Sequence, residues 1–171
     1  MGNHIMPSII RATTTSGLQV APDNSGSLQL QTNGTTTAVT IDTSQNVGIG
    51  TASPTVGYIL DVAGNFKVSG SIDENVYAVI DAAGVALTPR NGTIQTWTLG
   101  ASRTPTSGTW EAGESMTLMI NDGTAFTVTW TSLGVVWVGG TAPTLALTGF
   151  TVIELWKVST TIYGAVVGNV A

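Results

Sequence analysis

Two acidic residues, Glu111 and Glu114, are the first candidates for chemistry, because they lie three residues apart beside a glycine. Two carboxyl groups about 5–9 Å apart can serve as the acid and the base or nucleophile of a glycoside hydrolase. The same pair is far more typical of a solvated, glycine-containing turn, and we favour the turn. We therefore expect no catalytic residue and no enzymatic activity.

The chain has few residues suited to nucleophilic catalysis or to binding a metal or a cofactor. The chain has one histidine, His4, and no cysteine, so we expect neither a Ser-His-Asp triad nor a histidine or thiolate metal site. Gly48 and Gly50 form a lone Gly-x-Gly without the third glycine of a dinucleotide fingerprint. Pro54 follows where the helix of such a site would begin. We expect no metal and no cofactor.

Tryptophan is the remaining residue type that could bind a ligand. Trp110 lies between two glycines in an expected loop, and Trp137 precedes Gly139-Gly140. An exposed indole can stack on a sugar ring, so we name Trp110 as a possible receptor contact. The alternative is packing in the core or at a subunit interface. Packing is what we expect for the three tryptophans in phase with apolar neighbours, Trp97, Trp130 and Trp156.

The composition narrows the class of protein. Only 9% of the 171 residues are charged, the formal net charge is −5, and 42% are hydrophobic. A disordered chain needs the opposite balance, and a nucleic-acid binder needs a basic surface. No run of about 18 apolar residues is present, so we expect no membrane insertion. Abundant Val, Ile and Thr with 21 Gly indicate a β-protein with many turns.

A short apolar–any–apolar unit recurs from Leu18 to Val68, at intervals of roughly 8–11 residues that contain Gly, Asn, Ser and Pro. This period of two is typical of strands with one buried face. After the first pair, Leu18 and Val20, ten residues are expected to pack on a common axis: Leu28, Leu30, Val39, Ile41, Val47, Ile49, Leu60, Val62, Phe66 and Val68.

Strands of this size do not stabilise themselves. Each offers two apolar side chains, worth about 1.5–3 kcal/mol apiece when buried. Ordering the backbone costs about 1–2 kcal/mol for each residue. Either many stacked repeats or several intertwined identical chains would supply the missing burial, and six strands are few for a stack. We favour intertwined chains, which predicts a fibrous, oligomeric shaft.

The second half has longer strands and all five tryptophans. A short strand is expected within 76–80. Longer strands are expected over 93–99, over 150–158 and over 161–167, and a hairpin is expected to join 116–120 to 126–130. These elements predict a small antiparallel β-sandwich or jelly-roll head. The fold class is thus all-β, a short intertwined trimeric β-shaft followed by that head.

Two stretches are familiar. Asn46–Thr51, with the letters NVGIGT, is followed by Ser53-Pro54 and by LDVAG over 60–64. With its surroundings (28–70) it resembles the repeat of tailed-bacteriophage fibre and tailspike proteins. The stretch 135–164, which contains WVGGTAPTL and then FTVIELWKVSTTIYG, resembles a C-terminal β-domain of structural proteins from environmental, notably marine, phages. The resemblance implies a homotrimer, with three chains intertwined in the shaft and their β-domains forming a knob.

The expected organisation is an attachment arm over 1–23, a trimeric β-shaft over 24–75 and a β-sandwich head over 76–171. The expected partners are two identical chains, another virion protein bound through the arm, and a host surface glycan or protein, with no nucleic acid. The function expected is that of a homotrimeric tail fibre, on the virion exterior, that adsorbs to the host. The short chain keeps open a trimeric capsid decoration or head-fibre protein.

Overall fold

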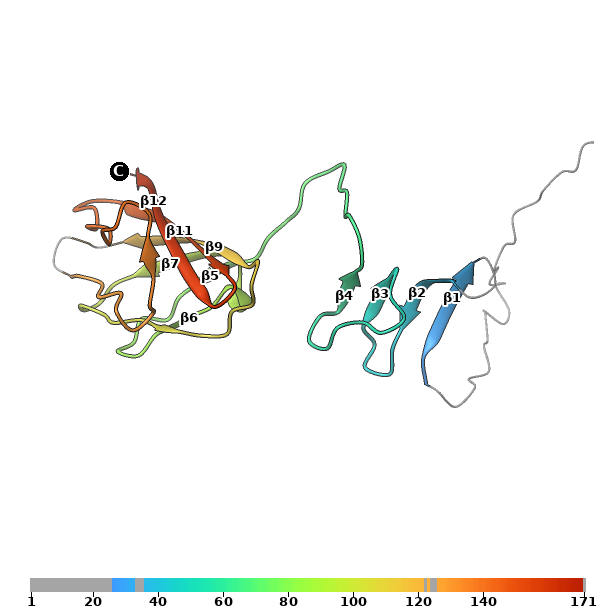
Figure 1. Cartoon of the computed structure of the whole chain (residues 1–171). Coiled ribbons are helices and arrows are strands. Elements are labelled where there is room, and N and C mark those ends of the chain that lie inside the picture. Colours follow the sequence, from blue (N-terminus) through green and yellow to red (C-terminus); the bar gives the residue numbers. More distant parts are fainter. Residues whose placement is uncertain (1–25, 33–35, 122, 124–125, 171) are drawn as a thin grey trace, which may run out of the picture. The chain divides into compact units, whose positions relative to one another are not determined.

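The computed structural model describes residues 26–32, 36–121, 123 and 126–170, and the chain divides into two compact units, Met1–Gly70 and Ser71–Ala171 (Figure 1). Regular structure is almost entirely β-strand, with a 3-10 turn at Pro89–Asn91, so the all-β class is confirmed. The expected arm and the Leu18/Val20 pair lie outside the described residues. No helix in the described ranges is long and apolar enough to cross a membrane.

The first unit contains a four-stranded sheet in the order β1-β2-β3-β4. Its strands are β1 (Leu28–Thr32), β2 (Thr36–Ile41), β3 (Val47–Ile49) and β4 (Leu60–Val62). β1 pairs with β2 and β2 with β3 in antiparallel fashion, whereas β3 and β4 are parallel. Four of the predicted apolar pairs therefore form strands.

The turn between β2 and β3 is fixed by one carboxylate. Asp42 Oδ1 accepts hydrogen bonds of 2.8 Å from the backbone amides of Ser44 and Asn46, and Asp42 Oδ2 accepts one of 3.0 Å from Asn46 Nδ2. The hydrogen bonds from Asn46 are the main cause that lowers the pKa of Asp42. Aspartate favours such turns because its short side chain can bind the backbone two residues on.

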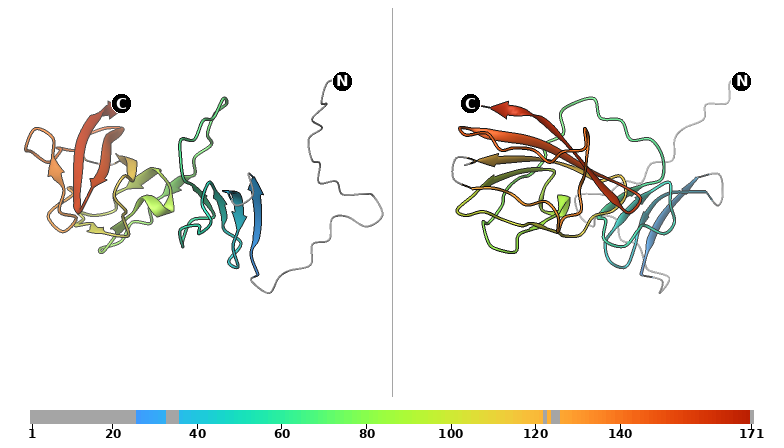
Figure 2. Two further views of the ribbon diagram at one scale, coloured as in Figure 1. Left: turned by 45° about the vertical axis from the view of Figure 1, so that its right-hand side comes forward. Right: turned by 60° about the vertical axis from the view of Figure 1, so that its left-hand side comes forward.

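The second unit is built on a six-stranded sheet in the order β10-β12-β11-β9-β7-β5, with a separate two-stranded sheet of β6 and β8 (Figure 2). The strands are β5 (Val76–Ala78), β6 (Ala86–Leu87), β7 (Ile94–Thr98), β8 (Thr106–Ser107), β9 (Ser115–Asn121), β10 (Val136–Trp137), β11 (Phe150–Val158) and β12 (Thr161–Val170). The predicted strands over 76–80, 93–99, 150–158 and 161–167 are thus present, and β12 is longer than expected.

The six-stranded sheet is mixed, where a purely antiparallel one was expected. β11 is antiparallel to β9 and β12, but β7 is parallel to both β5 and β9, and β10 is parallel to β12. The predicted 116–130 hairpin is wrong, because β9 pairs with β7 and β11 and only an isolated bridge at Val128, to Arg103, continues beyond the turn. Partners distant in sequence outcompete the neighbouring segment.

The core of the second unit lies against the inner face of this sheet. Each of its members is at most 7% exposed to solvent: Val85, Leu87, Trp97, Leu99, Trp110, Met116, Leu118, Ile120, Trp130, Leu133, Ile153, Leu155 and Ile162. Residues of β11 alternate between this core and the outer face, where Trp156 stacks on Tyr163 with ring centroids 6.0 Å apart. Burial of large aromatic and aliphatic side chains is the main source of stability for such a domain.

Candidate functional site

The most distinctive surface of the first unit is an apolar face on its four-stranded sheet. The pairing places Leu30 opposite Val39, Val39 opposite Ile49, and Ile49 opposite Val62. Residues opposite each other in a ladder project from the same side of the sheet. These four side chains therefore form one continuous row across all four strands.

A second row runs beside the first. Leu28 is opposite Ile41, Ile41 is opposite Val47, and Val47 is opposite Leu60. Because alternate residues of a strand share a face, this row lies on the same side as the first. The shaft face, as we call these two rows, comprises Leu28, Leu30, Val39, Ile41, Val47, Ile49, Leu60 and Val62.

The shaft face remains accessible in the single chain. Leu28 and Leu30 are each 43% exposed to solvent, Ile49 is 38% exposed and Leu60 is 52% exposed. The three valines are half-buried by their neighbours in the sheet. Eight aliphatic side chains from four strands are therefore gathered on one side and left incompletely covered, which is the arrangement of a binding surface rather than of a finished core.

On the opposite side of the same sheet, the chain itself covers the middle strands at Thr40 and Gly48, whereas Gln29 on β1 is exposed. A Cβ on Gly48 would lie 2.9 Å from Pro54 Cγ and 2.9 Å from Thr51 Cγ2, so the loop after β3 folds back onto this glycine. The loop is held by Asp61, whose Oδ2 accepts 2.8 Å hydrogen bonds from Thr55 N and Thr55 Oγ1. These contacts explain structurally why a glycine stands at position 48 of the NVGIGT segment and a proline follows at position 54. They also leave the shaft face as the open side.

Two of the ten predicted axis residues are not brought into this face. Phe66 and Val68 lie beyond β4 in a segment without strand structure, at 67% and 39% exposure. The expected strand at this pair is therefore wrong for the single chain. Its apolar–any–apolar pattern pairs with no strand among the described residues of the first unit, where β4 ends the sheet.

The structure corrects the prediction for Trp110. Its residue exposure is 5%, it belongs to the core, and its Nε1 donates a 2.9 Å hydrogen bond to the backbone carbonyl of Leu87. Neither face of this indole is free to stack on a sugar. Trp97 and Trp130 are buried as expected, and Trp156 is half-buried on the outer face of the sheet.

The acidic pair forms a turn held by one arginine. Glu114 Oε2 accepts a 2.7 Å hydrogen bond from the Glu111 amide, while Arg90 Nε lies 3.0 Å from Glu114 Oε1. Arg90 Nη2 lies 3.8 Å from Glu111 Oε1. Within the described ranges, no group of three or more His, Cys, Asp or Glu residues is arranged to hold a metal ion.

One carboxylate of the second unit is strongly held. Asp81 is bound through both its oxygens by Arg103, and it also accepts a 2.9 Å hydrogen bond from Trp97 Nε1 and one of 3.0 Å from Gly100 N. The hydrogen bonds from Arg103, with those from Trp97 and Gly100, lower the pKa of Asp81 to about 2, while partial burial opposes them. We interpret this cluster as a structural contact that holds the segment after β5 against the loop after β7.

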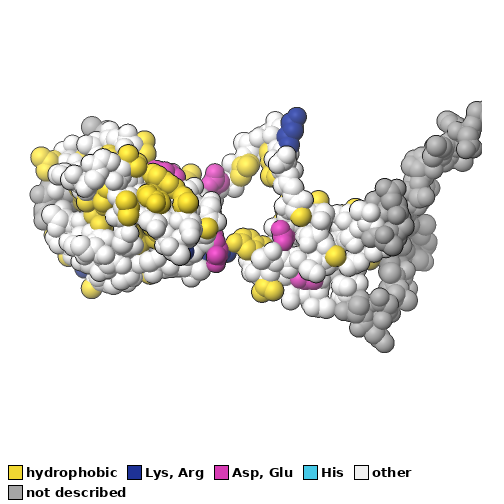
Figure 3. All heavy atoms as spheres, viewed as in Figure 1, with side chains coloured by type: hydrophobic (Ala, Val, Ile, Leu, Met, Phe, Trp, Pro, Cys, Tyr) yellow, Lys and Arg dark blue, Asp and Glu magenta, His cyan; other side chains and the backbone are white. Residues whose placement is uncertain are grey.

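Hydrophobic side chains also gather on the second unit, around β9 and β11 (Figure 3). On the outer face of the sheet Val152 lies opposite Met119, and both are half-buried. The hydroxyl of Thr117 donates a 2.8 Å hydrogen bond to Glu154 Oε2 on the same face. Both faces of β11 thus carry apolar groups, one of them only partly covered.

Comparisons of this chain with protein-family models, with curated proteins and with solved structures find no match.

Proposed function

We propose that this chain is a structural protein of a bacteriophage virion, a homotrimeric tail fibre that adsorbs to the host surface. It acts without enzymatic chemistry, by forming a shaft from three copies and presenting three heads. In this proposal it lies on the virion exterior and binds another virion protein through the arm over 1–23.

The observation that carries the proposal is the exposed shaft face. Five large side chains on it keep between 37% and 52% of their exposure. Full burial of such a side chain contributes about 1.5–3 kcal/mol, so each has about 1 kcal/mol still to gain. The strands are three to six residues long, and small sheets of this kind need packing on a hydrophobic face to be stable. A covering partner is therefore part of the folded state.

A second and third copy of the same chain are the partners that fit best. The shaft face carries no charged side chain, so identical faces can approach one another without leaving an ion unpaired. Identical subunits also close into symmetric assemblies, which is the common outcome for self-complementary surfaces. The number three comes from the resemblance of residues 28–70 to the phage fibre repeat.

The partly covered outer face of the six-stranded sheet supports the same proposal for the heads. It offers Trp156, Tyr163, Val152 and Met119 to a neighbouring copy. A trimer of this build serves equally as a capsid decoration or head-fibre protein, since the shaft face favours three copies without favouring a position on the particle.

Location on the particle tests the proposal. Gold-labelled antibodies against the purified protein are applied to intact particles of the phage that carries its gene, and label at the tail is expected. Label distributed over the capsid would favour the decoration role instead, and absence of the chain from purified, denatured particles would overturn both. Purified full-length protein should also compete with the phage for adsorption, and a matched sample of Ile49→Asp protein, which we expect to be monomeric, controls for avidity.

A further inference from the structure

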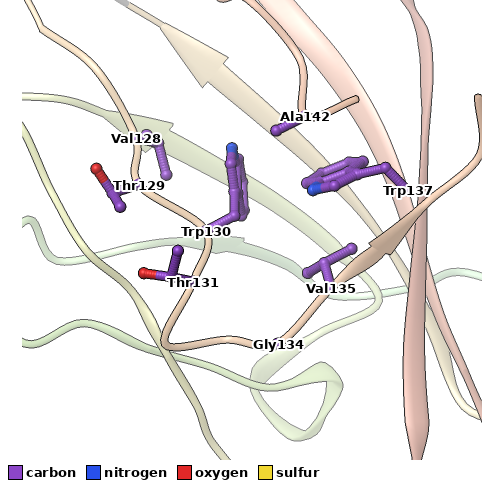
Figure 4. A pocket seen from close by; sticks show the side chains of 8 residues that line it. All are labelled: Val128, Thr129, Trp130, Thr131, Gly134, Val135, Trp137 and Ala142. Carbon is purple, nitrogen blue, oxygen red and sulfur yellow. The ribbon is translucent and has the colours of Figure 1, made fainter. Parts of the chain in front are cut away.

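A hollow at the edge of the second unit's core is unaccounted for by the shaft or by assembly. Its volume is about 670 Å³, and eight described residues line it: Val128, Thr129, Trp130, Thr131, Gly134, Val135, Trp137 and Ala142 (Figure 4). We call it the tryptophan hollow. Its walls come from β10 and from the segments before and after it. A cavity of this size has room for a small ring-shaped ligand.

Two indoles form the walls of the tryptophan hollow. The ring centroids of Trp130 and Trp137 lie 5.2 Å apart with their planes at 75°, an edge-to-face arrangement. Trp137 is held against β12, because a Cβ on Gly164 would lie 2.6 Å from its ring. Trp130 is only 5% exposed. Both rings are therefore fixed before any ligand arrives, which lowers the entropy cost of binding.

One polar group of the tryptophan hollow is unsatisfied. Trp130 Nε1 is fully buried and has no hydrogen-bond acceptor among the residues that the structure describes. The other two buried indoles of the same core differ, since Trp97 Nε1 donates to Asp81 and Trp110 Nε1 donates to Leu87, both at 2.9 Å. Buried donors are rarely left unpaired, so an acceptor entering beside Trp130 supplies what the chain itself does not.

The lining determines the chemistry of the ligand. None of the eight residues is charged, so an ionic ligand would be desolvated without a counter-charge. A purely aliphatic ligand would leave the Trp130 donor unpaired. Thr129 and Thr131 are exposed at the rim of the hollow, where rotation of their side chains can offer hydroxyl donors and acceptors to a ligand. An uncharged ring with apolar C–H faces and hydroxyl groups at its edge satisfies all three features.

We propose that the tryptophan hollow binds a neutral pyranose, with the sugar ring against the half-buried Trp137 indole and a sugar oxygen accepting the Trp130 Nε1 proton. The inference names the ligand class for the adsorption role and rests on that proposed function for its biological meaning. The binding itself depends on the second unit alone. It places the ring contact at Trp137, which is half-buried, and gives the buried Trp130 the role of hydrogen-bond donor.

Nuclear magnetic resonance of the full-length protein, labelled with ¹⁵N at tryptophan, tests the proposal. The probes are methyl β-galactopyranoside, methyl α-glucopyranoside and N-acetylglucosamine, added to about 50 mM, where even a millimolar complex is saturated. At least one is expected to shift the indole signals of Trp130 and Trp137, assigned with W130F and W137F. The signals of Trp97 and Trp110, whose donors are already bonded, should stay in place.

Matched variants separate a built site from weak adsorption. The double variant T129V/T131V keeps the shape of both side chains, removes their hydroxyls and should weaken binding about fivefold or more, as loss of a neutral hydrogen bond does. Thr148→Val, at an exposed threonine outside the hollow, should bind like the unaltered protein. The proposal is overturned if none of the sugars shifts Trp130 and Trp137, if all five indoles shift alike, or if the charged sugar N-acetylneuraminic acid binds equally well.

Light scattering on the same samples keeps the two proposals distinguishable. If the protein is a trimer and its indole signals do not shift, the proposed fibre stands and the proposed sugar site is overturned. If the protein is a monomer and its Trp130 and Trp137 signals shift, the proposed sugar site stands and the proposed trimer is overturned.

Discussion

Replacing Ile49 by aspartate tests the shaft face at its centre. Ile49 lies on β3, opposite Val39 on one side and Val62 on the other, and it keeps 38% of its exposure in the single chain. A carboxylate at this position can be hydrated in a monomer but not within an assembled shaft. We therefore predict that Ile49→Asp protein folds and does not assemble.

The magnitude follows from the exposure of the residue. The isoleucine loses about 1 kcal/mol of further burial per chain. Burying an unpaired carboxylate adds a penalty of several kcal/mol per ion after relaxation. Together they amount to about 4 kcal/mol or more for each chain, and each 1.4 kcal/mol is a factor of ten in affinity. Three copies multiply the effect, so assembly should be abolished at micromolar concentration.

The assay is size-exclusion chromatography with light scattering at pH 7 and near pH 4. Burial raises the pKa of an aspartate, so protonation in acid should restore part of the assembly of Ile49→Asp, whereas Ile49→Asn should show no such pH dependence. Gln29→Asp, on the other face of the same sheet, is the matched control and should assemble normally. Normal assembly of Ile49→Asp at pH 7, or dissociation of Gln29→Asp, would refute the proposed shaft face.

Three further predictions concern the stability of the single chain. The pKa of Asp81, lowered from 3.8 to about 2, corresponds to about 2 kcal/mol, reduced toward about 1 kcal/mol by solvent because 18% of the side chain is exposed. This stabilisation is present above pH 3.8 and is lost as the pH falls through 2. Asp81→Asn lacks the charge that pairs with Arg103. Its urea unfolding curve should therefore differ from that of the unaltered protein at pH 7, and the two curves should converge near pH 2. Gly48→Ala forces a methyl group to 2.9 Å from Pro54 and should destabilise the first unit by about 1–3 kcal/mol. Amide hydrogen exchange in β3 should become faster, and unchanged exchange would contradict the close packing. Trp110→Phe removes one of the two hydrogen bonds that the Leu87 carbonyl accepts, the other coming from the Gly108 amide, and should lower the free energy of unfolding by about 1 kcal/mol without weakening adsorption.

The period of two in the first half predicted its strands well, because each pair has one apolar face and a short turn. Leu28/Leu30 through Leu60/Val62 lie in the register that puts them on one face. Phe66/Val68 has the same pattern and forms no strand, since a strand requires a neighbour as well as a pattern. The parallel pairing of β3 with β4 is likewise set by the loop that folds back at Pro54, which periodicity does not report.

In the second half, length and alternation predicted β7, β11 and β12, but partners distant in sequence decided the rest. The alternating segments 116–120 and 126–130 suggested a local hairpin, whereas β9 pairs with strands before and after it. The glycines around Trp110 indicated an exposed loop, yet its indole turns inward to the Leu87 carbonyl. The unpaired Trp130 donor can be recognised only once its surroundings are assembled in space.

The mass of the full-length protein in solution is the most direct test of the central claim, that the shaft face is covered by further copies of the chain. Light scattering at neutral pH is predicted to give three times the chain mass of 17.5 kDa. A mass of 17.5 kDa, with the shaft face left open to solvent, would contradict it.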